Sequence, residues 1–299
     1  MAGALLKDTH PDKRNKEWTH HPLALQHPKA FIRGAHKKGL LVTAKHFPGH
    51  GDSSMDSHIG VISVDGDLAH LQNIEFPPFR KAIEAGVDAV LLAHARVPAL
   101  DADPNRIATT SSKIIEGTLG KQLGFKGVVV TDALEMRGLI TLYPNDPSPT
   151  ARAAVDAIKA GADIVTLPTD LNGAYRAILK AVQTGEISES RIDESVRRVL
   201  ALKAAVGLDR SRFVDMDKVD EVFSRKQDFE FAQHVADEAG TLVRNAGNSL
   251  PLATQSLDKP EKHCYCEPVF RRKDSLDCCS HPRPGQRPSE SRWLALLHR

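Results

Sequence analysis

The chain has few features that would mark a membrane or secreted protein. No apolar run in its 299 residues approaches the ~20 residues of a membrane-spanning helix. Its first residues, MAGALLKDTHPDKRNKEW, lack the apolar core of a signal peptide. All four cysteines lie after Lys262, so we expect no disulfide framework in the folded body. We therefore expect a cytoplasmic protein without a membrane partner.

The sequence also has little net charge and no glycine fingerprint for a nucleotide. A formal net charge of +2 is too small to indicate a nucleic-acid partner. No dinucleotide or P-loop glycine pattern follows any predicted strand, which weakens the case for a nucleotide-binding fold. With 41% hydrophobic and 26% charged residues, the composition is that of a globular protein. We expect no cofactor.

A helix end, a glycine stop and a strand start occur twice in the sequence. Residues 82–90 read AIEAGVDAV, and residues 157–165 repeat the pattern as AIKAGADIV. Another unit lies between them, with Ser111 or Ser112 as the cap of a helix that Gly124 ends. Near-continuous apolar runs predict parallel strands buried on both faces, at about 40–45, 88–93, 127–131 and 163–167.

Two further helices are predicted after these strands, capped by Asp170 and Ser190, the second reaching about Ala205. The alternation of strands and helices predicts an α/β fold. It supports either a (β/α)8 barrel or a doubly wound sheet.

The densest group of ionisable residues directly follows the first predicted strand. Residues 44–60 read AKHFPGHGDSSMDSHIG, and the breakers Pro48, Gly49 and Gly51 exclude a helix there. This segment is therefore a loop at a strand end, which is where parallel α/β folds bind ligands and carry out chemistry.

Polar residues also end the next two predicted strands, so one shared site is expected. They are Lys45 and His46 after the first strand, His94 and Arg96 after the second, and Asp132 after the third. Simpler explanations exist for some of them. Asp132 could cap the helix that follows it, and His94 could be a core histidine. His46 and His50 have the spacing of metal ligands, but Pro48 and Gly49 forbid the helix that such pairs use, so no metal is expected.

Two motifs carry a resemblance to a known family. KHFPGHGDSSMDSH at residues 45–58 and VVVTDALEM at residues 128–136 resemble glycoside hydrolase family 3, in its β-N-acetylhexosaminidase branch. The resemblance implies a TIM-type barrel and a retaining mechanism without cofactor. It also implies that Asp132 is the nucleophile and His58 the general acid/base, with Asp56 orienting His58. Lys45 and His46 match residues that hold sugar hydroxyls, and His94 and Arg96 would lie near the pocket.

The resemblance covers only part of such a barrel, because only residues 1–44 precede the first motif. We therefore expect a chain truncated at the N-terminus and in its second domain. Two half-barrels could pair, so a homodimer is expected. The predicted domains are an irregular segment at 1–27, a partial barrel at 28–210, a linker and the start of an α/β sandwich at 211–255, and a disordered or unrelated tail at 256–299.

Three functional hypotheses follow. The first is hydrolysis of terminal β-N-acetylglucosaminides, with a small carbohydrate as the partner. The second is another activity of the same family, a β-glucosidase or a phosphorylase. The third is an inactive fragment, because half of the barrel has no match in the sequence.

Overall fold

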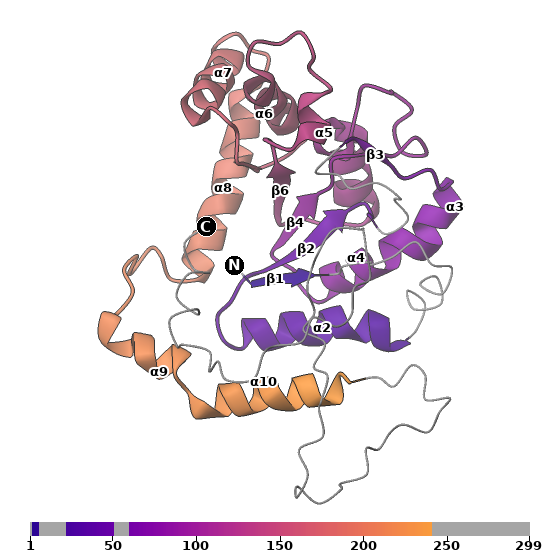
Figure 1. The fold of residues 1–299 in the computed structure, drawn as a ribbon. Helices are drawn as coiled ribbons and strands as arrows, with labels where there is room; N and C mark the ends of the chain where they lie inside the picture. The colour runs from indigo at the N-terminus through magenta and orange to yellow at the C-terminus, as the bar shows by residue number, and fades with distance from the viewer. Residues whose placement is uncertain (1, 6–21, 51–59, 241–299) are drawn as a thin grey trace, which may run out of the picture. The chain divides into compact units, whose positions relative to one another are not determined.

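The computed structural model describes residues 2–5, 22–50 and 60–240, and these are the coloured parts of Figure 1. The chain divides into two units, Met1–Phe223 and Ser224–Arg299, and this boundary falls inside the predicted segment 211–255. The second unit contributes one described helix, α10 (Lys226–Glu238). Asp56, His58, the four cysteines and the 256–299 tail lie outside the described residues.

The first unit is built on a five-stranded parallel sheet with the order β1-β2-β4-β6-β7. A shorter parallel pair joins β3 to β5. The strands are β1 (Ala2–Leu5), β2 (Val42–Phe47), β3 (Ile62–Ser63), β4 (Ala89–Leu92), β5 (Ala95–Arg96), β6 (Val128–Ala133) and β7 (Ile164–Thr166). The four strands predicted from the sequence are confirmed as β2, β4, β6 and β7, although β2 begins and ends two residues later than expected.

The strand order decides between the two architectures that the sequence left open. Along the main sheet the strands follow one another in chain order, and every neighbouring pair is parallel. A doubly wound sheet reverses its strand order at a switch point, whereas a barrel does not. The sheet is therefore a portion of a TIM-type barrel, and Figure 1 labels four of its strands, β1, β2, β4 and β6.

Helices follow the strands as a βα architecture requires. In the first unit they are α2 (Pro22–His36), α3 (Leu68–His70), η1 (Leu71–Glu75), α4 (Phe76–Glu84), η2 (Ala108–Thr110), η3 (Lys113–Gln122), α5 (Arg137–Ile140), α6 (Pro149–Ala160), α7 (Leu171–Gln183), α8 (Glu189–Ala205), η4 (Met216–Lys218) and α9 (Val219–Phe223). Helix α2 packs against α4, α6 against α7, and α8 against β6. None of the described helices has both the length and the apolar character that crossing a bilayer needs.

The segment predicted as irregular, 1–27, contains regular structure that the sequence did not reveal. Strand β1 pairs with β2 from Ala2–Val42 to Leu5–Lys45, and α2 begins at Pro22. A four-residue strand is too short to show a period in the sequence, and its pairing depends on a partner far along the chain. This part of the predicted domain division is therefore corrected.

Several predicted helix boundaries are confirmed by their hydrogen bonds. The Asp170 side chain accepts from the backbone N–H of Gly173 and caps α7. The Ser111 hydroxyl accepts from the Ile114 N–H at 3.3 Å, at the start of η3. Helix α8 is capped by Ser188 rather than by the predicted Ser190, because the Ser188 hydroxyl is the one that accepts from the Arg191 N–H.

The two copies of the sequence repeat have the same structure. Gly86 and Gly161 end α4 and α6 with φ angles of +81° and +119°, which favour glycine. The aspartate of each copy then bonds to the neighbouring strand. Asp88 Oδ2 accepts from the Val42 N–H at 2.7 Å, and Asp163 Oδ2 accepts from the Val129 N–H at 2.9 Å. Each repeat therefore uses a carboxylate to hold the start of the preceding strand.

The main hydrophobic core lies between the sheet and the helices that pack on it. Phe47 of β2 packs edge-on against Phe79, with ring centroids 5.1 Å apart, and stacks on Phe76 at 6.2 Å. All three rings are buried, as are Val90 and Leu92 of β4. The core thereby holds β2 and β4, whose carboxyl ends carry the candidate site, on one rigid support.

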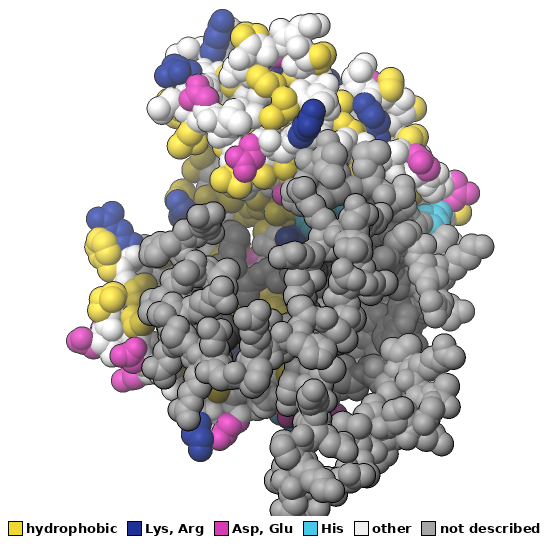
Figure 2. Space-filling view, viewed as in Figure 1, with side chains coloured by type: hydrophobic (Ala, Val, Ile, Leu, Met, Phe, Trp, Pro, Cys, Tyr) yellow, Lys and Arg dark blue, Asp and Glu magenta, His cyan; other side chains and the backbone are white. Residues whose placement is uncertain are grey.

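Apolar side chains are exposed on the last helices of this unit. Leu171, Tyr175 and Leu179 recur every four residues along α7 and are 71%, 66% and 43% exposed. Figure 2 shows hydrophobic side chains at the surface in the region of α6 and α7. Among the described strands, β7 pairs only with β6, and its three residues are half-buried. This side of the sheet therefore presents apolar surface beyond its last described strand.

Candidate active site

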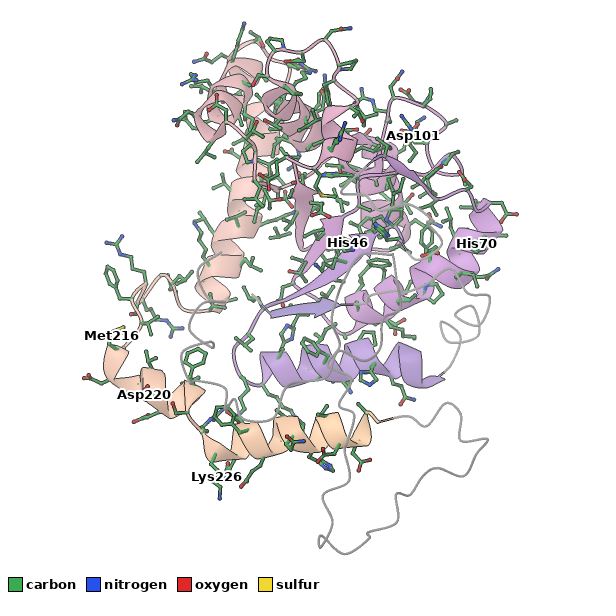
Figure 3. The ribbon with its side chains drawn as sticks, viewed as in Figure 1. His46, His70, Asp101, Met216, Asp220 and Lys226 are labelled. Carbon is green, nitrogen blue, oxygen red and sulfur yellow. The ribbon has the colours of Figure 1, made fainter. Side chains whose placement is uncertain are left out.

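Residues from three adjacent strands form the candidate site. His46 belongs to β2, His94 follows β4, and Asp132 belongs to β6, while β4 lies between the other two strands. His46 Nε2 lies 3.6 Å from Asp132 Oδ2, so this pair spans the carboxyl end of β4. Figure 3 marks His46 at the end of its strand. The structure thus brings together one predicted residue from each of the three strand ends.

Asp132 lies at a break in the register between β6 and β7. The pairing shifts between Val130 and Ala133, so Asp132 falls outside the regular ladder. Such bulges re-aim a side chain and are common beside active sites. Thr166 secures the bulge, because its N–H donates to Thr131 Oγ1 at 3.1 Å and its hydroxyl donates to the Thr131 carbonyl at 3.0 Å. The irregular strand is therefore held by specific bonds.

The Asp132 carboxylate is anchored on one side and accessible on the other. Its Oδ1 accepts from the Ala133 N–H at 2.8 Å, while the side chain remains 24% exposed. The next helix, α5, has Met136 at its N-cap and no side-chain cap bond, so the capping alternative for Asp132 is wrong. Glu135, three residues further on, is exposed. A carboxylate fixed at one oxygen and open at the other can act as a nucleophile.

His46 also lies at an irregularity, in this case of β2. The register between β2 and β4 shifts between Lys45 and Phe47, and the Lys45–His46 and Phe47–Pro48 peptide bonds are cis. The ring centroids of His46 and His50 are 5.6 Å apart. Within 2–5, 22–50 and 60–240, no three histidine, cysteine or carboxylate side chains form a group that could hold a metal ion. His46 thus lies near both Asp132 and His50.

His94 is the most buried ionisable group of the site, with 1% of the residue exposed. Its Nδ1 lies 2.7 Å from the Thr109 hydroxyl, and its Nε2 lies 3.0 Å from the Ala133 carbonyl oxygen. Burial lowers the pKa of His94, and the Ala133 bond and the Asp132 charge oppose that shift without cancelling it. The ring is therefore neutral near pH 7. Its contacts are those of a core histidine with both ring nitrogens hydrogen-bonded, which was the simpler explanation for this residue.

The other predicted site residues have different surroundings. Lys45 is half-buried on β2, next to His46. Arg96 lies on β5 in the second sheet, and its Nε donates to the Pro104 carbonyl at 2.7 Å. The predicted acid/base His58 and its partner Asp56 lie outside the described residues.

Glu75 is a candidate residue that the sequence analysis missed. It ends η1 with only 4% of the residue exposed, and its side chain lies directly against Gly49 of the first motif. A Cβ at Gly49 would meet Glu75 Oε2 at 2.0 Å, and the Gly49 φ angle is +147°. Nothing in the local sequence distinguishes Glu75 from a solvated glutamate, and only its burial does so. The buried Glu75 side chain therefore packs against the backbone just after β2.

A parallel sheet in chain order, with reactive side chains at the carboxyl ends of adjacent strands, defines a barrel-type α/β protein with an enzyme-like site. A model of the glycosyl hydrolase family 3 N-terminal domain matches residues 11–202, and the chain belongs to this family.

Relatives and solved structures agree with this membership. The chain is 29% identical over 234 residues to a β-N-acetylglucosaminidase/β-glucosidase of Cellulomonas fimi, covering 75% of this chain and 40% of the relative. A family 3 β-N-acetylglucosaminidase structure from Paenibacillus sp. str. FPU-7 has a TM-score of 0.68 and 38% identity, covering 74% of this chain and 41% of that one. The β-glucoside phosphorylase BglX has a TM-score of 0.69 and 26% identity, covering 76% and 42%. The chain thus spans about two fifths of the length of these three proteins.

Proposed function

We propose that the chain acts on terminal β-N-acetylglucosaminides by a retaining double displacement. Asp132 is the nucleophile, and His58, oriented by Asp56, is the general acid/base. Lys45 and His46 hold hydroxyl groups of the sugar. The observation that carries the proposal is the Asp132 carboxylate, which is anchored by the Ala133 N–H and accessible beside His46.

The chemistry balances with these residues. Asp132 attacks the anomeric carbon and forms a glycosyl ester, while the His58 imidazolium gives its proton to the leaving oxygen. The neutral imidazole then takes a proton from water, which attacks the anomeric carbon and releases Asp132 as a free carboxylate. An imidazole has an unperturbed pKa of ~6.5, so it can donate and then accept a proton near neutral pH.

A trapping experiment on the full 299-residue chain tests this proposal. An N-acetylglucosaminyl fluoride with a second fluorine at C5 should form a slowly hydrolysed ester, and mass spectrometry of peptides should place it on Asp132. Asp132→Asn should abolish both labelling and turnover of an aryl N-acetylglucosaminide. Glu135→Gln, which changes an exposed carboxylate three residues away, is the matched control and should leave both intact. A label on another carboxylate, or turnover that survives Asp132→Asn, would refute the assignment.

A second candidate is phosphorolysis, which the likeness to the phosphorylase BglX favours. A neutral histidine base repels phosphate less than a carboxylate does, so phosphate could replace water as the acceptor. The products of reactions with and without phosphate distinguish the two, because phosphorolysis releases a sugar 1-phosphate and hydrolysis releases the free sugar. A chain that neither turns over nor takes the label would instead be the inactive fragment.

The assembly and the location of the chain are proposals as well. The exposed apolar stripe of α7 and the half-buried β7 support a homodimer. Light scattering after size-exclusion chromatography should give twice the 32.7 kDa chain mass, and the double variant Leu171→Glu/Tyr175→Glu should give the chain mass. We also propose a cytoplasmic location, and cell fractionation tests it.

A further inference from the structure

We infer that His94 is a positioning residue that holds the strand end carrying Asp132, and that it does not bind the sugar. The inference rests on the proposed role of Asp132 as the nucleophile. His94 follows β4, the strand between those that carry His46 and Asp132, so it lies next to both of their carboxyl ends.

The His94 ring makes a hydrogen bond to the last residue of β6, beyond the point where the backbone ladder between β4 and β6 ends. The last paired residues of these strands are Leu91 and Val130. Beyond them, His94 Nε2 lies 3.0 Å from the carbonyl oxygen of Ala133. On the other side of the same peptide group, the Leu134 N–H donates to the Thr166 carbonyl at 2.9 Å. The peptide that follows Ala133 is therefore held on both sides, by the side chain of His94 just after β4 and by the backbone of Thr166 in β7.

The protons of this cluster can be assigned from its partners. A carbonyl oxygen only accepts, so His94 Nε2 carries a hydrogen and donates it to Ala133. In the neutral ring that burial favours, Nδ1 then has no hydrogen and accepts from the Thr109 hydroxyl at 2.7 Å. The same hydroxyl donates to the Ala93 carbonyl at 3.1 Å, so its single hydrogen is shared between these two acceptors. His94 is thus the Nε2–H tautomer.

This arrangement connects His94 to the nucleophile through a single residue. Ala133 accepts from His94 at its carbonyl, and its N–H donates to Asp132 Oδ1 at 2.8 Å. Fixing the carbonyl keeps the Ala133 backbone in place, and the N–H then holds one oxygen of the carboxylate. Reacting groups need such support, because small displacements from the productive geometry cost rate.

The same contacts leave His94 no capacity for a sugar hydroxyl. Only 1% of the residue is exposed, and both ring nitrogens already have partners within 3.0 Å. The expectation that His94 lines the pocket as a ligand is therefore replaced by a role through Ala133.

A pair of amide variants of the full chain separates positioning from general packing. In His94→Gln, the side-chain amide nitrogen reaches the place of Nε2 and can donate to Ala133. In His94→Asn, the shorter amide reaches only the place of Nδ1, next to Thr109. Residue-resolved hydrogen exchange of the Ala133 amide reports directly on its bond to Asp132. The Val129 amide, which donates to Asp163, is the internal control.

We expect His94→Gln to keep the wild-type protection of the Ala133 amide within threefold, and His94→Asn to lose it tenfold or more. The Val129 amide should change in neither variant. Equal protection of Ala133 in both variants, or a matching loss at Val129, would overturn the inference. Should neither variant fold, ¹⁵N spectra of the wild-type histidine rings decide the matter, because an Nδ1–H tautomer at His94 contradicts the assignment and an Nε2–H tautomer supports it.

The rate of labelling by the fluorinated sugar is measured on the same variants. It should fall at least tenfold in His94→Asn with little change in the sugar concentration for half-maximal rate, and it should recover in His94→Gln. A wild-type chain that shows the expected exchange pattern but takes no label would refute the proposed function and leave the positioning of the Asp132 carboxylate standing.

Discussion

His46 Nε2 and Asp132 Oδ2 lie 3.6 Å apart, and each residue sits where the register of its strand is broken. The break at His46 lies in the pairing of β2 with β4, and the break at Asp132 lies in the pairing of β6 with β7. The two side chains meet beyond the end of β4, the strand between β2 and β6. This separation is longer than a direct hydrogen bond, and under the proposed function a sugar hydroxyl between the two groups would bond to both.

Replacing His46 should therefore affect both binding and reaction. We expect His46→Ala to raise KM for an aryl N-acetylglucosaminide about tenfold and to lower kcat, because a partner of Asp132 and of the sugar is lost. Steady-state kinetics of the full chain measures this change. His27→Ala, which alters an exposed histidine of α2, is the control and should leave both constants unchanged. Unaltered constants in His46→Ala would contradict the role.

The proposed acid/base role of His58 predicts a dependence on the leaving group. His58→Ala should slow substrates with poor leaving groups by ~10²–10⁴, and it should slow activated aryl glycosides far less, because a good leaving group needs no proton. Comparing alkyl and nitrophenyl N-acetylglucosaminides tests this expectation. Equal losses on both substrate classes would refute it.

The contact between Gly49 and Glu75 predicts that no side chain is tolerated at position 49. Gly49→Ala would place its Cβ 2.0 Å from Glu75 Oε2 and would strain a φ angle of +147°, so we expect a loss of ~2–4 kcal/mol in the free energy of unfolding. Gly34→Ala is the control, because a Cβ there meets nothing within 4 Å, and it should be neutral or slightly stabilising in helix α2. Urea unfolding measures both. Adding Glu75→Ala to Gly49→Ala should restore part of the loss, and a double variant no more stable than Gly49→Ala would count against this contact.

Asp163 should be among the most sensitive structural residues of the chain. Its side chain is fully buried, and it accepts from the Val129 N–H, the Ser195 hydroxyl and the Arg191 guanidinium. We expect Asp163→Ala to cost about 3–5 kcal/mol, because the largely buried Arg191 loses its buried carboxylate partner and the buried Val129 N–H and Ser195 hydroxyl lose their acceptor. The control is Asp193→Ala, which breaks an exposed pair at 3.7 Å and should cost under ~0.5 kcal/mol. Similar losses in the two variants would contradict the structural role.

The burial of His94 predicts how stability depends on pH. Its pKa is lowered in the folded chain, so below the ordinary value of 6.5 the unfolded chain binds more protons than the folded one. Stability should therefore fall as pH drops below 6.5, by about 1.4 kcal/mol for each unit between the two pKa values. His94→Gln should lose less stability than the wild type between pH 7.5 and pH 5. Parallel curves for the two proteins, measured by urea unfolding, would contradict this expectation.

The sequence by itself determined the class of the fold and several of the points where helices begin and end. Near-continuous apolar runs predicted β2, β4, β6 and β7, because the strands of a parallel sheet are rich in apolar residues. The prediction that they are buried on both faces does not hold for β7, whose three residues are half-buried. Gly86 and Gly161 correctly predicted where two helices end, because glycine adopts the positive φ angle found there. Asp170 correctly predicted where α7 begins, because its side chain accepts from a backbone N–H of the first turn.

Only the tertiary structure decided relations between residues far apart in the chain. Strand β1 depends on its pairing with β2, and the role of Glu75 depends on its contact with Gly49. His94 illustrates the same limit. Its place at a strand end was evident from the sequence, but its bonds to Thr109 and Ala133 exist only once β4, η2 and β6 are assembled. Neighbouring residues in the chain determine helix caps and turns, whereas the packing of distant residues determines burial and hydrogen-bond partners.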